Sequence, residues 1–483
     1  MMGLTPQVDQ SAEAYRRERQ AHWDLVARQM DTWKGWNNYY HHRLAEIYRF
    51  LVAPGQRVLE LGCAQGDLLA AVKSSFGVGV DFSGEMITRA AKRHPKLNFV
   101  QADAHICPLG ETFDVVILSD LLNDVCDVQA VFEQVRRVTS SHSRIIINSY
   151  SRLWELPLAL AEKLGLAKTT LFQNWLTVED IAGLLYMAGF EMIRTWPEIV
   201  WPLRTPLLDG FFNKFVVKLW PFRYLALTNL IIARPQPHPS EKASEPHVSV
   251  VVPARNEAGN IPQIMARVPE MGAGTEIVFI EGHSRDHTYE AIEAAIVNHP
   301  ERSCKLFRQS GVGKGDAVRL GYNQASGDIL MILDADLTVP PEDLPRFYQA
   351  LVSGKGDFAN GVRLVYPMKK EAMRFFNLLG NKFFSLAFSW LLGQPIKDTL
   401  CGTKVLWKAD YDRIAGNRAY FGDFDPFGDF DLLFGAARLN LKIVDLPIRY
   451  RERTYGTTNI QRWKHGWLLL KMVAFAASRI KFI

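Results

Sequence analysis

Two separate stretches of the chain share one form, a strongly apolar run that ends abruptly in acidic or glycine residues. The first is VLELGCAQGDLL at residues 58–69, and the second is ILMILDADLTVPPEDL at residues 329–344. Such runs are typical of buried strands in an open α/β sheet, which binds its ligands outside the carboxyl ends of the strands. Because the residues at the two ends differ, the sequence predicts two active sites of different chemistry.

The length and composition fit a globular protein with more than one domain. The chain has 483 residues, of which 48% are hydrophobic and 22% are charged. A chain of this length favours two or three domains. Its five cysteines are scattered and form no C-x-x-C pair, so neither a disulfide framework nor a zinc cluster is expected. We therefore expect a cytoplasmic protein.

The order of the elements predicts two doubly wound α/β domains. Short apolar runs alternate with helical patterns from about residue 57 to 233, and the alternation restarts at residue 247. Between them lies PQPHPSEKASEP, which is rich in proline and charge and has no apolar periodicity. The predicted parts are a helical segment at 1–45, a first domain at 46–234, a linker at 235–246, and a second domain at 247–483 that ends in an amphipathic helix.

The residues after the first apolar runs fit a nucleotide-type cofactor. Glu60, Gly62 and Gly66 follow one run, and Asp81 ends the next, which is the interval of a βαβ unit whose second acid binds a ribose. With Asp103 in QADAHICPL, the region from about 45 to 234 resembles class I S-adenosylmethionine-dependent methyltransferases. The glycines could also be turn residues and the aspartates helix N-caps, but the order of all these residues favours a cofactor site.

That resemblance implies a Rossmann-like fold and S-adenosylmethionine as the cofactor. It places Gly62 and Gly66 at the methionine portion, Asp81 at the ribose, Asp103 and Ala104 beside the adenine, and Glu60 in the same cofactor site. Asp120 follows the fourth strand toward the methionine end and the acceptor, although helix capping explains it equally well. The methyl acceptor is left open.

Two carboxylates mark the second predicted site. Asp334 and Asp336 stand two apart directly after a buried run, a spacing that suits Mg or Mn bound to a nucleotide-sugar diphosphate. A pair of turn or N-cap aspartates is the alternative. The neighbouring motifs VVPARNE, IEGHSRDHT and GVGKGDAV occur in an order that resembles family 2 glycosyltransferases of the A-type fold, over about residues 247–465.

Within that family the likeness is greatest to dolichyl-phosphate mannose and polyprenyl-phosphate glucose synthases. It implies a donor site made of Pro253, Ala254, Asn256, Glu257, Glu281, Ser284, Lys314, Asp316 and Asp334. Glu281 replaces a more usual aspartate and His283 is an added residue, so the choice between a UDP- and a GDP-sugar stays open. Asp334 and Asp336 would be the metal ligands.

The resemblance also implies an acceptor side, with phosphate-binding arginines and acidic residues. These are Arg363, Arg374, Arg453, Asp398, Asp429 and Asp431, of which Asp429, Asp431 and Arg453 join Asp336 as expected catalytic residues. A polyprenyl phosphate is already anionic near neutral pH and needs no strong base, and the arginines favour it as the acceptor. A glycan hydroxyl would need a carboxylate to take its proton.

The last forty residues are rich in both basic and aromatic side chains, which suits an anionic membrane surface or, equally, a docked helix. No uncharged stretch reaches the roughly 18 residues needed to span a bilayer. We expect a peripheral protein on the cytoplasmic face, with no nucleic-acid partner, and leave homo-oligomerisation open. The alternative is a glycosyltransferase whose methyltransferase-like half is only a binding or recruiting module, through residues 201–222.

Overall fold

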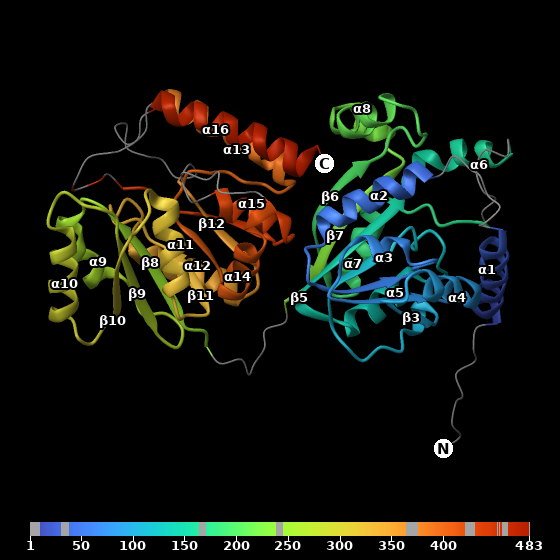
Figure 1. The fold of residues 1–483 in the computed structure, drawn as a ribbon, viewed down its shortest axis with the longest axis horizontal. Helices are drawn as coiled ribbons and strands as arrows, with labels where there is room; N and C mark the ends of the chain where they lie inside the picture. The colour runs from blue at the N-terminus through green and yellow to red at the C-terminus, as the bar shows by residue number, and fades with distance from the viewer. Residues whose placement is uncertain are drawn as a thin grey trace, which may run out of the picture. The chain divides into compact units, whose positions relative to one another are not determined.

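The computed structural model describes residues 10–29, 38–163, 171–237, 245–363, 375–420, 430–451, 453, 455 and 462–482. The chain forms two compact units, one within residues 1–236 together with 482–483 and the other within residues 237–481. Each unit has its own seven-stranded sheet (Figure 1). The division falls at Pro237, inside the proline-rich stretch 235–246.

The sheet of the first unit has the strand order β3-β2-β1-β4-β5-β7-β6. Its strands are β1 (Arg57–Leu61), β2 (Phe76–Asp81), β3 (Asn98–Gln101), β4 (Phe113–Ser119), β5 (Thr139–Tyr150), β6 (Phe190–Glu198) and β7 (Thr228–Pro235). Strands β1 to β5 are parallel, while β7 is antiparallel to both β5 and β6. The strand order reverses beside β1, which is where open α/β sheets bind their ligands.

Eight α-helices of the first unit lie within the described residues. They are α1 (Gln10–Gln29), α2 (Asn38–Leu51), α3 (Asp67–Ala71), α4 (Gly84–Arg93), α5 (Val128–Arg137), α6 (Glu155–Lys163), α7 (Val178–Met187) and α8 (Leu208–Lys214), with 3-10 turns η1 (Ala104–Ile106), η2 (Arg152–Trp154), η3 (Val216–Lys218) and η4 (Phe222–Leu225). Side-chain caps fix several starts, because Ser83, Asp127 and Thr177 each accept a hydrogen bond from the first turn of α4, α5 or α7.

The sheet of the second unit has the order β10-β9-β8-β11-β13-β12-β14. Its strands are β8 (Val248–Ala254), β9 (Thr275–Glu281), β10 (Ser303–Arg308), β11 (Ile329–Ile332), β12 (Phe358–Val362), β13 (Lys404–Trp407) and β14 (Ile443–Pro447). Strands β8 to β11 are parallel, and β13 is antiparallel to β11 and β12. The order here reverses beside β8, so the ends of β8 and β11 are the expected ligand edge.

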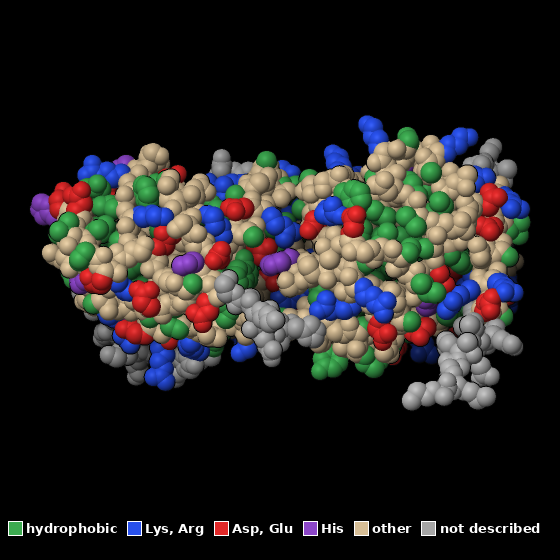
Figure 2. All heavy atoms as spheres, turned by 90° about the horizontal axis from the view of Figure 1, so that it is seen from below, with side chains coloured by type: hydrophobic (Ala, Val, Ile, Leu, Met, Phe, Trp, Pro, Cys, Tyr) green, Lys and Arg blue, Asp and Glu red, His purple; other side chains and the backbone are tan. Residues whose placement is uncertain are grey.

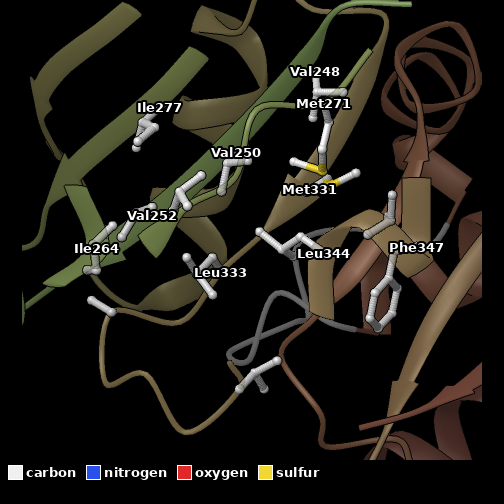
Figure 3. Packing of buried hydrophobic residues seen from close by; sticks show 14 of the residues in the cluster. Val248, Val250, Val252, Ile264, Met271, Ile277, Met331, Leu333, Leu344 and Phe347 are labelled. Atoms are coloured by element: carbon white, nitrogen blue, oxygen red, sulfur yellow. The ribbon is translucent and has the colours of Figure 1, made fainter. Parts of the chain in front are cut away.

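The helices of the second unit are α9 (Ile261–Arg267), α10 (Thr288–Asn298), α11 (Lys314–Gln324), α12 (Leu344–Val352), α13 (Phe375–Leu392), α14 (Lys408–Gly416), α15 (Phe430–Arg438) and α16 (Arg462–Ala476), with turns η5 (Ala258–Asn260), η6 (Pro341–Asp343), η7 (Arg418–Tyr420) and η8 (Ala477–Lys481). Alternate residues of β8, namely Val248, Val250 and Val252, enter one core with Leu344 and Phe347 from the start of α12 (Figure 3). The predicted fold class, two α/β domains with largely parallel sheets, is confirmed.

Two candidate active sites

The loop between β1 and α3 carries the glycines predicted to cradle a cofactor. Gly62 and Gly66 have φ values of +72° and +74°, a region in which a side chain is strained, and Ala64 between them has φ +46°. A Cβ on Gly62 would lie 2.8 Å from Leu121 Cδ1, and one on Gly66 would lie 2.6 Å from the ring of Phe99. Both positions therefore require glycine, and the loop turns tightly at the end of β1.

Asp81, the last residue of β2, lies at the ligand edge of the sheet beside this loop. One oxygen of its carboxylate accepts from the N–H of Ala64 and the other from the N–H of Ser83, each at 2.9 Å. Burial raises the pKa of Asp81 to about 6, against the lowering effect of these two bonds. The carboxylate is thus fixed by the glycine loop and ionised at neutral pH, with lone pairs left to accept from hydroxyl groups.

Glu60 is a second buried acid at the same edge. Its side chain is 2% exposed, and Oε2 has no hydrogen-bond partner among the described residues. Burial raises the pKa of Glu60 well above its ordinary value. A buried acceptor of this kind fits a polar ligand group, because leaving it unsatisfied costs about 1–3 kcal/mol.

The structure places Asp103 after β3, where it caps η1, the turn that starts at Ala104. It accepts from the N–H of His105 at 2.9 Å and pairs with Arg16 Nε at 3.2 Å. Burial raises its pKa, but the hydrogen bonds from His105 and the charge of Arg16 outweigh it and lower the pKa overall. The capping role is therefore real, and it does not preclude contact with a cofactor.

Sequence reasoning predicted a helix near the N-terminus but not its position across the strand ends. Helix α1 reaches the loops after β2, β3 and β4: Gln20 donates to Phe82 O at 3.1 Å, Arg16 pairs with Asp103, and Trp23 donates to Asp124 at 2.5 Å. Arg19 also pairs with Asp124. No local pattern in the sequence encodes these contacts, since the partners lie 62 to 105 residues away.

Asp120, directly after β4, is the most perturbed acid on the expected acceptor side. Its carboxylate accepts from Tyr40 Oη at 2.9 Å and from Asn148 Nδ2 at 2.6 Å, and its backbone has φ +52°. Burial raises the pKa of Asp120 to about 7, despite both hydrogen bonds. A non-glycine residue held at positive φ stores strain of a kind that clusters at functional sites.

In the second unit, Asp334 and Asp336 follow β11 as predicted, and each meets a basic residue. Asp334 Oδ1 lies 2.6 Å from Lys314 Nζ, and Asp336 Oδ2 lies 2.7 Å from Arg453 Nη2. Burial raises the pKa of Asp334, but Lys314 outweighs it and the pKa is lowered overall. Asp336 also accepts from the hydroxyl of Thr338 at 2.8 Å.

Arg453 joins this pair to the loop after β8. Its Nη1 lies 3.3 Å from Glu257 Oε1, so one guanidinium contacts acids from two strand ends. Burial raises the pKa of Glu257 to about 7, although Arg453 and a hydrogen bond from Asn260 lower it. Five predicted residues, at positions 257, 314, 334, 336 and 453, therefore gather at one edge of the sheet.

Glycine 402 is a member of this site that sequence reasoning missed. A Cβ built on it would overlap both Asp334 Oδ2 and Lys314 Nζ. Gly402 precedes β13, which pairs with β11 in antiparallel register, so the closeness arises from the sheet. The only signal in the sequence is a glycine within KDTLCGTK.

The predicted donor loops also come together. Pro253 and Ala254 end β8, and Asn256, at φ +58°, donates its N–H to Ser284 Oγ at 3.0 Å. Ser284 in turn donates its N–H to Glu281 at 2.5 Å. Asp316, in the first turn of α11, accepts from the N–H of Gly311 at 3.1 Å and so holds the loop before Lys314.

Three predicted acceptor residues form ion pairs within the protein. Arg363 forms a bidentate ion pair with Asp398, at 2.7 Å and 2.9 Å. Burial lowers the pKa of Arg363, but the charge of Asp398 and its hydrogen bonds outweigh burial and raise the pKa overall. Asp431, at the start of α15, lies 2.8 Å from Arg418 Nε and 3.5 Å from Arg319 Nε. Arg374 and Asp429 lie outside the described residues.

The donor set at the second site fits a divalent cation that shares its ligands with a substrate. The described residues contain no group of three or more His, Cys, Asp or Glu side chains able to hold a metal ion by themselves. Mg²⁺ is commonly held by one or two carboxylates together with substrate phosphates and water. Asp334 and Asp336 supply two such hard oxygen ligands.

Comparison with known proteins assigns a family to each unit. Residues 53–189 match the family described as methyltransferase domain, and residues 249–405 match glycosyl transferase family 2. The chain therefore combines a methyltransferase domain with a family 2 glycosyltransferase domain.

Two curated relatives match the glycosyltransferase part. Dolichol-phosphate mannosyltransferase of Pyrococcus furiosus is 33% identical over 220 residues, which is 44% of this chain and 59% of that protein. Undecaprenyl-phosphate 4-deoxy-4-formamido-L-arabinose transferase of Pseudomonas aeruginosa is 33% identical over 111 residues, 22% of this chain and 33% of that protein. The chain thus spans less than two thirds of either relative.

Among solved structures, glucosyl-3-phosphoglycerate synthase of Mycobacterium tuberculosis, in complex with Mn²⁺, UDP and glucosyl-3-phosphoglycerate, is 18% identical with a TM-score of 0.36. The match covers 49% of this chain and 80% of that one. A likeness this low says nothing about the reaction of this chain.

Proposed function

We propose that the second unit transfers a sugar from a UDP- or GDP-sugar to a polyprenyl phosphate, with Mg or Mn bound at Asp334 and Asp336. The observation that carries the proposal is the convergence of Lys314 and Arg453 on these two carboxylates at the ligand edge of the sheet, where Arg453 also pairs with Glu257. Both curated relatives, a dolichol-phosphate and an undecaprenyl-phosphate sugar transferase, support a polyprenyl phosphate as the acceptor. Such an acceptor also implies a peripheral position on the cytoplasmic face of the membrane.

The residues present suit transfer between two phosphate groups. When bound, a divalent cation would neutralise charge that develops on the diphosphate leaving group. Lys314 and Arg453 bind phosphate oxygens once these replace their carboxylate partners, and donors fixed in this way favour the transition state. Asp336 then orients the donor by its place at the end of β11, while Asp431 is the proposed base if the acceptor is a hydroxyl compound.

We further propose that the first unit transfers a methyl group from S-adenosylmethionine to a second acceptor. The fixed carboxylate of Asp81, the unsatisfied Oε2 of Glu60 and the positive-φ glycines fit a nucleoside joined to an amino acid through a sulfonium, which carries no phosphate. Asp120 stands on the acceptor side, and with a pKa of about 7 it is suited to take a proton from a hydroxyl or amine.

An extraction assay tests the glycosyltransferase proposal. Purified full-length protein is incubated with Mn²⁺ or Mg²⁺, a polyprenyl phosphate and labelled UDP- and GDP-sugars, and label is counted in the organic phase. Metal-dependent transfer of label into that phase supports the proposal and identifies the donor. If nucleoside diphosphate forms without lipid-bound label, the acceptor is a hydroxyl compound and the lipid assignment fails.

Asp81→Asn is expected to weaken the binding of S-adenosylmethionine by about 10- to 100-fold, because hydrogen bonds to a charged acceptor contribute about 1.5–3 kcal/mol. Isothermal titration calorimetry measures the loss. Asp114→Asn is the matched control, since Asp114 accepts from the N–H of Arg57 at the amino-terminal end of β1, away from the ligand edge. Equal affinity of the two variants for S-adenosylmethionine would show that Asp81 does not contribute to cofactor binding.

Asp120→Asn is expected to change how stability depends on pH. The folded state keeps a proton on Asp120 up to about pH 7, whereas the unfolded chain releases it near pH 4, so the wild type loses stability as pH rises between these values. The variant lacks this titration and should gain about 2 kcal/mol relative to the wild type between pH 5 and pH 8. Urea unfolding at pH 5 and pH 8 measures this difference in the free energy of unfolding. Glu111→Gln, at an exposed residue, is the control.

A difference between the wild type and Asp120→Asn that is the same at pH 5 and pH 8 would contradict the raised pKa. In that case Asp120 would be an ordinary ionised carboxylate, and its proposed part in proton transfer would lose its basis.

A further inference from the structure

Residues 207–225 of the first unit present an ordered apolar surface. Helix α8 packs on η3, and η3 packs on η4, so the three short elements form one block (Figure 1). Its exposed apolar side chains include Leu207, Phe211, Leu219, Trp220, Phe222 and Leu225, and those of Leu207 and Trp220 are 90% and 76% exposed. We call this set the α8–η4 surface.

Two polar side chains of the same block, Asn213 and Lys218, point inward. Asn213, which is fully buried, accepts from the N–H groups of Val200 and Trp201 at 2.8 Å and donates to Tyr39 Oη at 3.1 Å. Lys218 forms a buried ion pair with Glu198 on β6. Asn213 and Lys218 therefore anchor the block from the inside, while most of its large apolar side chains remain in contact with solvent.

Apolar side chains that are held at the surface in this way are stabilised when a lipid layer or an apolar partner covers them. Burying a polar group costs free energy unless it is hydrogen-bonded. Because the buried side chains of Asn213 and Lys218 have their partners, the block is fixed in this orientation. Exposed apolar patches on an ordered surface mark sites of interaction with proteins or membranes. The electrostatic surroundings distinguish these two occupants.

The charges around the block favour an anionic bilayer. Arg204, Lys214 and Arg223 lie within or just before residues 207–225 in the sequence, and Asp209 is the only acidic residue between positions 201 and 225. By contrast, acidic and basic side chains are interspersed over the face drawn in Figure 2. Tryptophan and tyrosine are enriched where membranes meet water, and Trp220 and Tyr224 are both exposed here. Basic residues beside an apolar insertion are attracted to anionic lipid headgroups.

We propose that the α8–η4 surface is a docking site for an anionic membrane, and that the methyltransferase unit itself binds the bilayer. The inference rests on the proposed function in one respect, because it gives a defined surface to the membrane contact that a polyprenyl phosphate acceptor implies. Among the described residues no helix is both long and apolar enough to cross a membrane.

Vesicle flotation of the full-length protein tests this surface. Wild-type protein is expected to float with vesicles of phosphatidylcholine and phosphatidylglycerol, and less with phosphatidylcholine alone. Leu219→Ser/Trp220→Ser should lower binding by about tenfold or more, since it removes the inserted side chains. Arg204→Glu/Arg223→Glu should lower binding to the anionic vesicles by a similar factor, about tenfold or more.

Two matched controls separate this surface from general effects. Tyr186→Ser/Met187→Ser removes exposed apolar side chains of α7, and Lys92→Glu/Lys96→Glu reverses exposed charges near α4. Both should float like the wild type. Because all the substituted residues are exposed, thermal unfolding of the variants should match that of the parent.

Three outcomes would overturn the inference: no flotation of the wild type, equal flotation of Leu219→Ser/Trp220→Ser and the wild type, or a wild-type dimer in sedimentation equilibrium that this variant dissociates. The last would assign the surface to a second copy of the chain. Sugar transfer to detergent-solubilised polyprenyl phosphate is measured in parallel. If sugar transfer is absent while the wild type still floats with the vesicles, the proposed function is wrong and the membrane-docking inference stands.

Discussion

Replacing Asp336 by asparagine is expected to lower sugar transfer by about 10²–10³-fold, the effect of removing one well-placed electrostatic contact from an active site. Asp336 is a proposed metal ligand, and its carboxylate lies 2.7 Å from Arg453. The amide has the same shape but lacks the charge that a cation requires. Extraction of labelled lipid from the polyprenyl phosphate assay measures the loss.

Asp412→Asn is the matched control, because Asp412 is an exposed aspartate on α14 of the same unit. Its transfer rate should equal that of the wild type. A variant at position 336 that kept more than about a tenth of the wild-type rate would contradict the assigned role, given the magnitudes above.

Gly402→Ala is expected to lower transfer by about 100-fold, because small displacements of reacting or positioning groups have effects of that size. The added methyl group would overlap Asp334 Oδ2 and Lys314 Nζ and force both side chains to move. These atoms are the ends of side chains and not backbone atoms, so the fold should tolerate the change while the donor site is displaced. A higher KM for the sugar nucleotide and an unchanged melting temperature are the expected results.

Gly416→Ala provides the comparison, because a Cβ at Gly416 would meet no atom within 4 Å. If Gly402→Ala matched it in KM and rate, the space beside Asp334 would have no part in binding the donor.

The positions of Asp334, Asp336, Gly62, Gly66 and Asp81 at strand ends could be predicted because they depend on local pattern. An apolar run followed by acids or glycines defines a strand end, and parallel strands bring such ends to one edge. The fold class followed from the same alternation of runs. Which residues would then bind the cofactor or the metal is a separate matter and stays a prediction.

Partners far apart in the sequence could not be predicted. Arg363 and Asp398 were each assigned to an acceptor phosphate or sugar, yet the structure pairs them 35 residues apart in an ion pair with two hydrogen bonds. Nothing local in NGVRL or KDTLCGTK encodes that pairing. The same holds for Gly402, whose contact with Asp334 depends on the antiparallel register of β13 and β11.

Helix α1 is attached to the first sheet by an unusual kind of contact for a helix. Of its residues whose side chains are described, only Ala27 and Arg19 are buried, and its links to the strand ends run through Arg16, Arg19, Gln20 and Trp23. The partly exposed Arg16–Asp103 pair weakens as dissolved ions screen it, whereas the buried Arg19–Asp124 pair is screened much less. Of these two ion pairs, the one at Arg16 is therefore the more sensitive to the ionic strength of the solution.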